Sequence, residues 1–209
     1  MIYLKGNKTE LKAIVFDLGN VLLAYNPAHF MFELGIPQEK IPRLIEIIDG
    51  RPEYAEYDRG ILSKDDIIQL AVRDEPSMRR EIIHYMKHRA GCFTPITNNV
   101  ELLYRAKETG LKTYLLSDCP EDDYAYFKDH FIFLHDLDGE VISGACQITK
   151  PNPGIFQHLL KTYPEIDPAY SLFVDDREKN TEAGAKMGFL TLNLPARGTI
   201  EDYLEMTEE

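Results

Sequence analysis

The side chains of this chain that could do chemistry are aspartates, a serine and a lysine that follow apolar segments. They are Asp17, Ser117, Asp118, Lys150, Asp175 and Asp176. A carboxylate can attack phosphorus as a nucleophile, and carboxylate oxygens are ligands that Mg²⁺ prefers. A serine hydroxyl can bind phosphate oxygens, and a lysine ammonium offsets the negative charge that gathers where carboxylates face a phosphate. Taken in order along the chain, the set supplies the parts for phosphoryl transfer.

Each of these residues also has a purely structural interpretation. A serine that leaves a strand is usually a helix cap, and a lysine before proline usually lies at the surface, so Ser117 and Lys150 are weak indicators alone. The adjacent pair Asp175 and Asp176 is harder to dismiss, because neighbouring carboxylates repel each other unless a cation lies between them. The combination is therefore more informative than any one member.

The apolar segments before these residues predict a parallel sheet that would bring them together. Leu11 to Phe16 has the pattern of a buried strand, and further strands are expected at 112–117, 131–134, 171–174 and 189–192. An extended stretch is also expected to follow the turn at 136–139, through Gln147. Helical patterns lie between these strands, near 98–109, 121–130, 153–162 and 179–187. This alternation predicts an α/β fold with a Rossmann-like, doubly wound parallel sheet, whose strands present their carboxyl ends at one edge.

A helical block interrupts this pattern directly after the first strand. Between Pro27 and Arg89 no segment predicts a strand, whereas several segments carry apolar residues at helical spacing. Ser63, with Asp66 three residues later, predicts a capped helix start, and Pro76 is well placed to begin another helix. We therefore expect an all-α cap at residues 25–91, inserted into a core domain of residues 1–24 and 92–209.

Composition limits the class of protein and its partners. A length of 209 residues with 44% hydrophobic content can bury a core, and a net charge of -12 without a Lys/Arg cluster argues against nucleic acid or anionic membrane as a partner. The chain begins with no signal-like leader and its apolar runs are short, so we expect a cytoplasmic protein. Three cysteines without metal-site spacing are expected to be reduced thiols. The oligomeric state is not indicated.

Four motifs resemble those of the haloacid dehalogenase superfamily, in its phosphatase branch with a helical cap. They are Phe16–Val21, Leu115–Asp118, Lys150–Phe156, and Val174–Asp176 together with Asn180 and Gly184-Ala185. The segment Asp58-Arg59-Gly60, followed by Ser63, is similar to the cap of this branch, which includes bacterial glucose-1-phosphate phosphatases and the phosphatase domain of soluble epoxide hydrolases. The resemblance covers essentially the whole chain, and it implies the α/β fold with a helical cap and a dependence on Mg²⁺.

The resemblance also implies a set of metal ligands. Asp17 would be both a ligand and the nucleophile that forms an aspartyl-phosphate, and the carbonyl oxygen of Gly19 would be a second ligand. Asp176 would bind Mg²⁺ directly. Asp175 would bind it through water or would steady Lys150.

The remaining residues of the set would bind the phosphoryl group. By the same resemblance, Ser117 and the backbone at Asp118 would hold the transferring phosphoryl, and Lys150 would bridge it to Asp17. The expected substrate is a small phosphorylated metabolite, and a sugar phosphate is one candidate.

Two positions depart from the pattern of this family. Gly19 stands where most of its phosphatases carry the aspartate that protonates the leaving group, a contribution typically worth about 10²- to 10⁴-fold in rate. Asp118 stands where asparagine is commoner, so one hypothesis is that Asp118 supplies the missing acid. Tyr25, His29 and His84 are further polar candidates, although such residues are more often structural or exposed.

Three functions follow from this reading of the sequence. The first is a Mg²⁺-dependent phosphomonoesterase. The second is a haloacid dehalogenase-type hydrolase, because dehalogenases also lack the second aspartate, although they have little use for Asp175 and Asp176 together with Lys150. The third is a weakly active or inactive relative that binds a phosphorylated ligand or a protein partner, and only the glycine at position 19 favours it.

Overall fold

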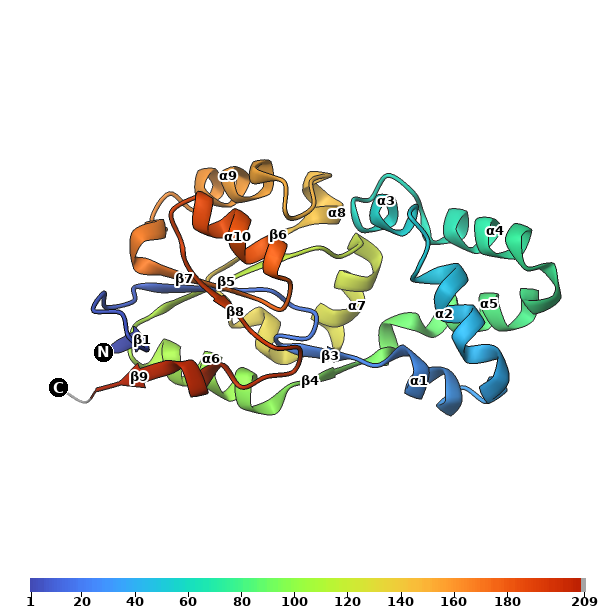
Figure 1. Cartoon of the computed structure of the whole chain (residues 1–209), viewed down its shortest axis with the longest axis horizontal. Coiled ribbons are helices and arrows are strands. Elements are labelled where there is room, and N and C mark those ends of the chain that lie inside the picture. Colours follow the sequence, from blue (N-terminus) through green and yellow to red (C-terminus); the bar gives the residue numbers. More distant parts are fainter. Residues whose placement is uncertain (208–209) are drawn as a thin grey trace.

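A computed structural model describes residues 1–207, and its centre is a five-stranded sheet in which every strand runs parallel to its neighbours (Figure 1). In spatial order the strands are β6 (Gly139–Ile142), β5 (Lys112–Ser117), β2 (Ala13–Phe16), β7 (Ser171–Asp175) and β8 (Leu190–Asn193). The central strand β2 is buried along its whole length, as its apolar composition requires. The predicted parallel α/β fold is confirmed.

Helices cover both faces of this sheet because successive side chains of a buried strand point to opposite faces. In β2, Ile14 and Phe16 belong to the apolar cluster that includes α6 (Thr97–Glu108) and α7 (Glu121–His130). Ala13 and Val15 belong to the cluster that includes α9 (Pro153–Thr162), against which α10 (Glu178–Lys186) also packs. Figure 1 shows α9 and α10 on one side of the sheet and α6 on the other. The sheet is therefore doubly wound.

The helical block forms its own apolar cluster, beside the carboxyl edge of the sheet in Figure 1. Its helices are α1 (Pro27–Glu33), α2 (Ile41–Ile48), α3 (Tyr54–Asp58), α4 (Lys64–Asp74) and α5 (Arg79–His88). The buried residues of this cluster run from Met31 to Met86 and include none from the sheet. The predicted capping box at α4 is present, since the backbone N–H of Asp66 donates to Ser63 Oγ and that of Ser63 donates to Asp66 Oδ2. The domain boundaries at 25 and 91 stay a prediction.

Two short strands connect this cap to the core. β3 (Leu23–Tyr25) enters the cap and β4 (Phe93–Pro95) leaves it, and the two pair antiparallel. The sequence did not predict them, because three residues cannot display a strand period. The same reason applies to β1 (Ile2–Leu4) and β9 (Leu204–Met206), an antiparallel pair that joins the two ends of the chain.

Two predicted elements are wrong after α7. The segment expected as a strand at 131–134 is a 3₁₀ helix, Ile132–His135, in which Phe133 and Leu134 are buried while Ile132 is exposed. The extended stretch expected through Gln147 is divided between β6 and a short helix, α8 (Ser143–Cys146). Four apolar residues do not distinguish a strand from a helical turn, which explains the first error. Within residues 1–207, no helix is long and apolar enough to span a membrane.

Further 3₁₀ turns connect the longer elements. They lie at Gln38–Lys40, Pro76–Met78, Arg89–Cys92, Pro168–Tyr170 and Ile200–Tyr203. The turn Pro76–Met78 occupies the start of the helix that Pro76 was expected to begin, so that α5 itself begins at Arg79. The turn Arg89–Cys92 ends the cap and leads into β4.

Candidate active site

The register of the sheet brings the sequence-predicted residues together at its carboxyl edge. Phe16 pairs with Leu115 on one side and with Val174 on the other, so the residues that follow these three strands emerge side by side. A cavity of about 190 Å³ opens there, between the sheet and the cap. From the core it is lined by Asp17, Gly19, Asn20, Ser117, Asp118, Lys150, Asp176 and Arg177, and from the cap side by Tyr25, Asp49, Tyr54, Asp58, Arg89 and Phe93, among others.

Lys150 links two of the acidic residues. Its Nζ donates to Asp17 Oδ1 at 2.7 Å, to Asp175 Oδ2 at 2.7 Å and to the carbonyl oxygen of Leu116 at 2.8 Å. Burial lowers the pKa of Lys150, but the carboxylates of Asp17 and Asp175 outweigh this and raise it above its usual value. The lysine therefore carries its positive charge at the base of the cavity.

Asp17 is held in an environment that disfavours its negative charge. Burial raises the pKa of Asp17 to about 7, against the opposing effect of Lys150. A divalent cation beside this carboxyl group would favour its ionised form and so lower that pKa. A bound cation would therefore stabilise the ionised form of Asp17 in this buried position.

The acidic cluster offers oxygen ligands suited to such a cation. Asp17, Asp175 and Asp176 each place a carboxylate oxygen within 4.8 Å of the others. Asp175 is fully buried, and both of its oxygens already accept hydrogen bonds, from Lys150 and Asn180 among others. Asp176 is half-buried and lines the cavity, where it accepts one bond, from Asn20 Nδ2 at 3.2 Å. The donor set fits Mg²⁺, with Asp17 and Asp176 better placed for direct contact than Asp175.

The residues expected to bind phosphate lie on the same cavity. Ser117 ends β5 and is buried, with 2% of its surface exposed. Asp118 Oδ1 accepts the backbone N–H of Lys150 at 2.8 Å, and burial raises the pKa of Asp118. Asp118 therefore ties the loop that carries Lys150 to the end of β5.

Gly19 leaves room where a longer side chain would lie. A Cβ atom at this position would meet nothing within 4 Å, and the backbone of Gly19 lines the cavity. The absence of an acid here is therefore not forced by crowding. Of the other polar candidates, Tyr25 lines the cavity, whereas His29 and His84 are exposed on the cap.

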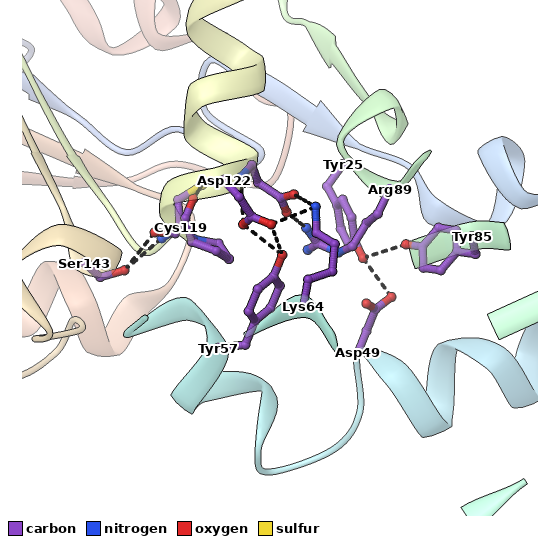
Figure 2. Close-up of polar contacts among 11 residues, drawn as sticks. Tyr25, Asp49, Tyr57, Lys64, Tyr85, Arg89, Cys119, Asp122 and Ser143 are labelled. Carbon is purple, nitrogen blue, oxygen red and sulfur yellow. Dashed lines mark hydrogen bonds and ion pairs between the residues drawn. The ribbon is translucent and has the colours of Figure 1, made fainter. Parts of the chain in front are cut away.

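The cap side of the cavity is organised around Arg89, which sequence reasoning missed. Its buried guanidinium bonds to Asp123 and lies over the rings of Tyr54 and Tyr25, at 5.0 Å and 5.7 Å from their centroids. Beside Arg89, the Tyr25 hydroxyl donates to Asp49 Oδ2 at 2.7 Å (Figure 2). An isolated arginine at the end of a helix normally marks a solvated surface, so the sequence held no signal for this cluster.

Three polar atoms of this cluster are buried without a hydrogen-bond partner. They are Arg89 Nε, the Tyr54 hydroxyl and Asp49 Oδ1; the only other such side-chain atom in the described part of the chain is Asn180 Oδ1. Buried polar groups are almost always paired, and an unpaired one costs about 1–3 kcal/mol. All three atoms belong to residues that line the cavity, so their missing partners would have to be water or a bound ligand.

Comparisons with known proteins give similarities over nearly the whole chain. A family model of haloacid dehalogenase-like hydrolases matches residues 11–188. A sesquiterpene phosphatase from Aspergillus oryzae is 26% identical over 186 residues, which cover 89% of this chain and 91% of that protein.

Solved structures of low sequence identity share the fold. An HAD family enzyme from Bacteroides thetaiotaomicron, in complex with magnesium and inorganic phosphate, superposes with a TM-score of 0.69 at 20% identity and covers 89% of this chain and 95% of its own. L-2-haloacid dehalogenase from Xanthobacter autotrophicus, with chloropropionic acid covalently bound, gives a TM-score of 0.67 at 16% identity and covers 88% and 77% of the two chains.

Proposed function

The chain belongs to the haloacid dehalogenase-like hydrolase family, and on that premise we propose that it is a Mg²⁺-dependent phosphomonoesterase acting on a small phosphorylated metabolite. The observation that carries this proposal is the contact of Lys150 Nζ with both Asp17 and Asp175, beside the cavity-lining carboxylate of Asp176. An arrangement of buried negative charge around one lysine supports the binding of a cation together with a phosphate dianion. The phosphatase from A. oryzae and the phosphate-bound bacterial structure agree with this choice.

The residues of the cavity have distinct tasks in the proposed reaction. Asp17 attacks phosphorus, the bond between phosphorus and the leaving oxygen breaks, and an aspartyl-phosphate forms. Lys150 keeps Asp17 in place and offsets charge on the phosphoryl group, while the Ser117 hydroxyl donates to a phosphate oxygen. Water then attacks the phosphorus of the aspartyl-phosphate, which releases phosphate and restores Asp17.

Magnesium fits this scheme through a small set of ligands. Asp17, Asp176 and the carbonyl oxygen of Gly19 would hold it directly, and Asp175 would act through water or through Lys150. When bound, Mg²⁺ supplies positive charge that stabilises the phosphate oxygens during the transfer.

The phosphatase proposal is tested by a screen of phosphorylated metabolites with and without Mg²⁺. We expect phosphate release that requires Mg²⁺, is lost on addition of EDTA and returns with excess Mg²⁺, because the carboxylates otherwise repel the substrate. Phosphate release that is unchanged by EDTA would contradict the metal site. Release of halide from a haloacid without added metal would instead support the dehalogenase function, which is the alternative that Gly19 favours.

The cap side of the cavity favours a neutral, hydroxylated leaving group. Five aspartates line the cavity against three cationic side chains, so a second anionic group on the substrate would be repelled: Asp17, Asp49, Asp58, Asp118 and Asp176 against Arg89, Lys150 and Arg177. The unpartnered atoms of Arg89, Tyr54 and Asp49 include donors and an acceptor, as hydroxyl groups require.

The Tyr54→Phe variant tests this substrate class. We expect kcat/KM for a hydroxylated substrate such as a hexose phosphate to fall about 10-fold, because one hydrogen bond worth roughly 1.4 kcal/mol is lost. Hydrolysis of p-nitrophenyl phosphate should change little. Tyr114→Phe is the matched control, because Tyr114 is a buried tyrosine whose hydroxyl bonds to Glu165 and does not line the cavity. A higher kcat/KM for a farnesyl phosphate than for hexose phosphates in the wild-type protein would refute a hydroxylated leaving group.

A further inference from the structure

The proposed reaction lacks a proton donor for the leaving group, since Gly19 has no side chain. Four of the five aspartates that line the cavity have other partners or tasks. Asp17 is the nucleophile, Asp176 is a metal ligand, Asp49 accepts from Tyr25, and Asp118 accepts from the backbone of Lys150. The fifth is Asp58, whose carboxyl group makes no hydrogen bond or ion pair to any residue in 1–207, although the side chain is half-buried.

The core itself fixes the position of Asp58. The cap residues on either side of it bond to core elements: Tyr57 hydroxyl to Asp122 Oδ1 at 3.1 Å, and Arg59 Nε to the carbonyl oxygen of Gln147 at 3.1 Å. The carbonyl oxygen of Asp58 accepts a hydrogen bond from Ser143 Oγ. Figure 2 shows Tyr57 reaching Asp122 at the start of α7, with Ser143 beside Cys119. Asp58 is thus held at the junction of cap and core, over the carboxyl edge of the sheet.

Close backbone packing strengthens this junction. Gly60 has φ of +69°, and a Cβ atom there would lie 2.6 Å from the carbonyl oxygen of Gly144 in α8. The end of α3 therefore approaches the core as closely as backbone atoms allow.

The surroundings of Asp58 suit a group that exchanges a proton near neutral pH. Burial raises the pKa of Asp58 to about 7. Four charged groups face it from other elements, of which Arg89 and Arg177 lower the pKa while Asp118 and Asp123 raise it. Both protonation states are therefore accessible near pH 7, which is the condition for efficient acid–base catalysis.

We propose that Asp58 is the proton donor and acceptor of this site and does the work that Gly19 cannot do. The proposal rests on the phosphatase function. In the first step, an oxygen of Asp17 bonds to phosphorus, the bond to the leaving oxygen breaks, and that oxygen takes the proton of the Asp58 carboxyl group and departs as an alcohol. In the second step, a water oxygen bonds to phosphorus and gives a proton to the Asp58 carboxylate. The Asp17–phosphorus bond breaks, phosphate leaves, and Asp58 is again protonated.

The Asp58→Asn variant, measured in a single turnover with two substrates, tests this role. Glycerol 2-phosphate leaves as an alkoxide that needs a proton, whereas p-nitrophenyl phosphate has a leaving group that does not. We expect the first release of glycerol to slow by about 10²- to 10⁴-fold and that of p-nitrophenol to slow by less than about 3-fold. Asp65→Asn, the same chemical change at an exposed cap aspartate that does not line the cavity, is the control and should match the wild-type protein with both substrates.

The pH profile gives a second readout. In the wild-type protein the rate of the first release of glycerol should decline as pH rises above about 7, where Asp58 loses its proton, and this decline should be absent from Asp58→Asn.

Two outcomes of these measurements would overturn the proposal. One is release of glycerol by Asp58→Asn at the wild-type rate, and the other is an equal loss of rate with both substrates. A loss confined to glycerol in Asp118→Asn, with Asp58→Asn unaffected, would assign the donor to Asp118. If the wild-type protein hydrolyses neither ester nor any other phosphorylated metabolite, the phosphatase proposal is contradicted, and the role of Asp58 is contradicted with it.

Discussion

The Asp17→Asn variant is expected to lose hydrolysis of p-nitrophenyl phosphate by at least about 10⁴-fold in kcat. A carboxamide is neutral and a poor nucleophile, and losses of this size or larger follow removal of a catalytic nucleophile elsewhere. Asparagine has nearly the same shape as aspartate, so the contact with Lys150 changes in charge rather than in packing. Initial rates with excess Mg²⁺ measure the effect.

Stability measurements separate this chemical effect from damage to the fold. The pKa of Asp17 is raised to about 7 by burial, so folding loses stability as pH rises from the unfolded value of 3.8 through 7, where the buried group becomes ionised. Removing the charge should therefore leave Tm at pH 8, without Mg²⁺, equal to or above that of the wild-type protein. Activity equal to that of the wild-type protein in Asp17→Asn would remove Asp17 as the nucleophile. A large drop in Tm would assign the loss to misfolding.

The sequence was sufficient to predict the core fold because buried, largely apolar strands alternate with helical patterns along the chain. The strands 13–16, 112–117 and 171–175 are buried except at Lys112, and parallel pairing then places whatever follows them at one edge. The positions of Asp17, Ser117 and Asp175 at that edge are a direct consequence of this register. For the same reason, motifs far apart in the sequence were informative about one site.

The cap side of the site could not be predicted from the sequence, because packing of several helices creates it. Arg89, Tyr54 and Asp49 come from different cap segments, and their alignment on one cavity depends on how those helices meet. The only indication of Asp58 in the sequence was the resemblance of the segment Asp58-Arg59-Gly60 to the cap of haloacid dehalogenase-type phosphatases. The approach of Asp58 to the core depends on the contact of its carbonyl oxygen with Ser143 and of Gly60 with Gly144, which no local pattern encodes.

The Lys150→Met variant is expected to lose both activity and stability. Methionine has a similar length but no charge, so Asp17 and Asp175 would be left as buried carboxylates without their lysine. Breaking such a buried arrangement by removing one partner typically costs about 3–5 kcal/mol in the free energy of unfolding. Urea unfolding at pH 8 measures this loss. Lys112→Met is the control, because Lys112 is an exposed lysine, and removing its ion pair with Asp138 should cost less than about 1 kcal/mol.

The pH dependence of Lys150→Met identifies the charge as the cause. The pKa of Asp17 is already raised to about 7 by burial, and removing the positive lysine raises it further, so at pH 5 the carboxyl group is neutral and needs no counter-charge. The loss of stability should therefore be smaller at pH 5 than at pH 8. Adding Asp17→Asn to Lys150→Met should recover part of the stability at pH 8, because one of the two unpaired charges is gone. An equal loss at both pH values, without recovery in the double variant, would mean that packing of the lysine stem, rather than its charge, holds the acidic cluster together.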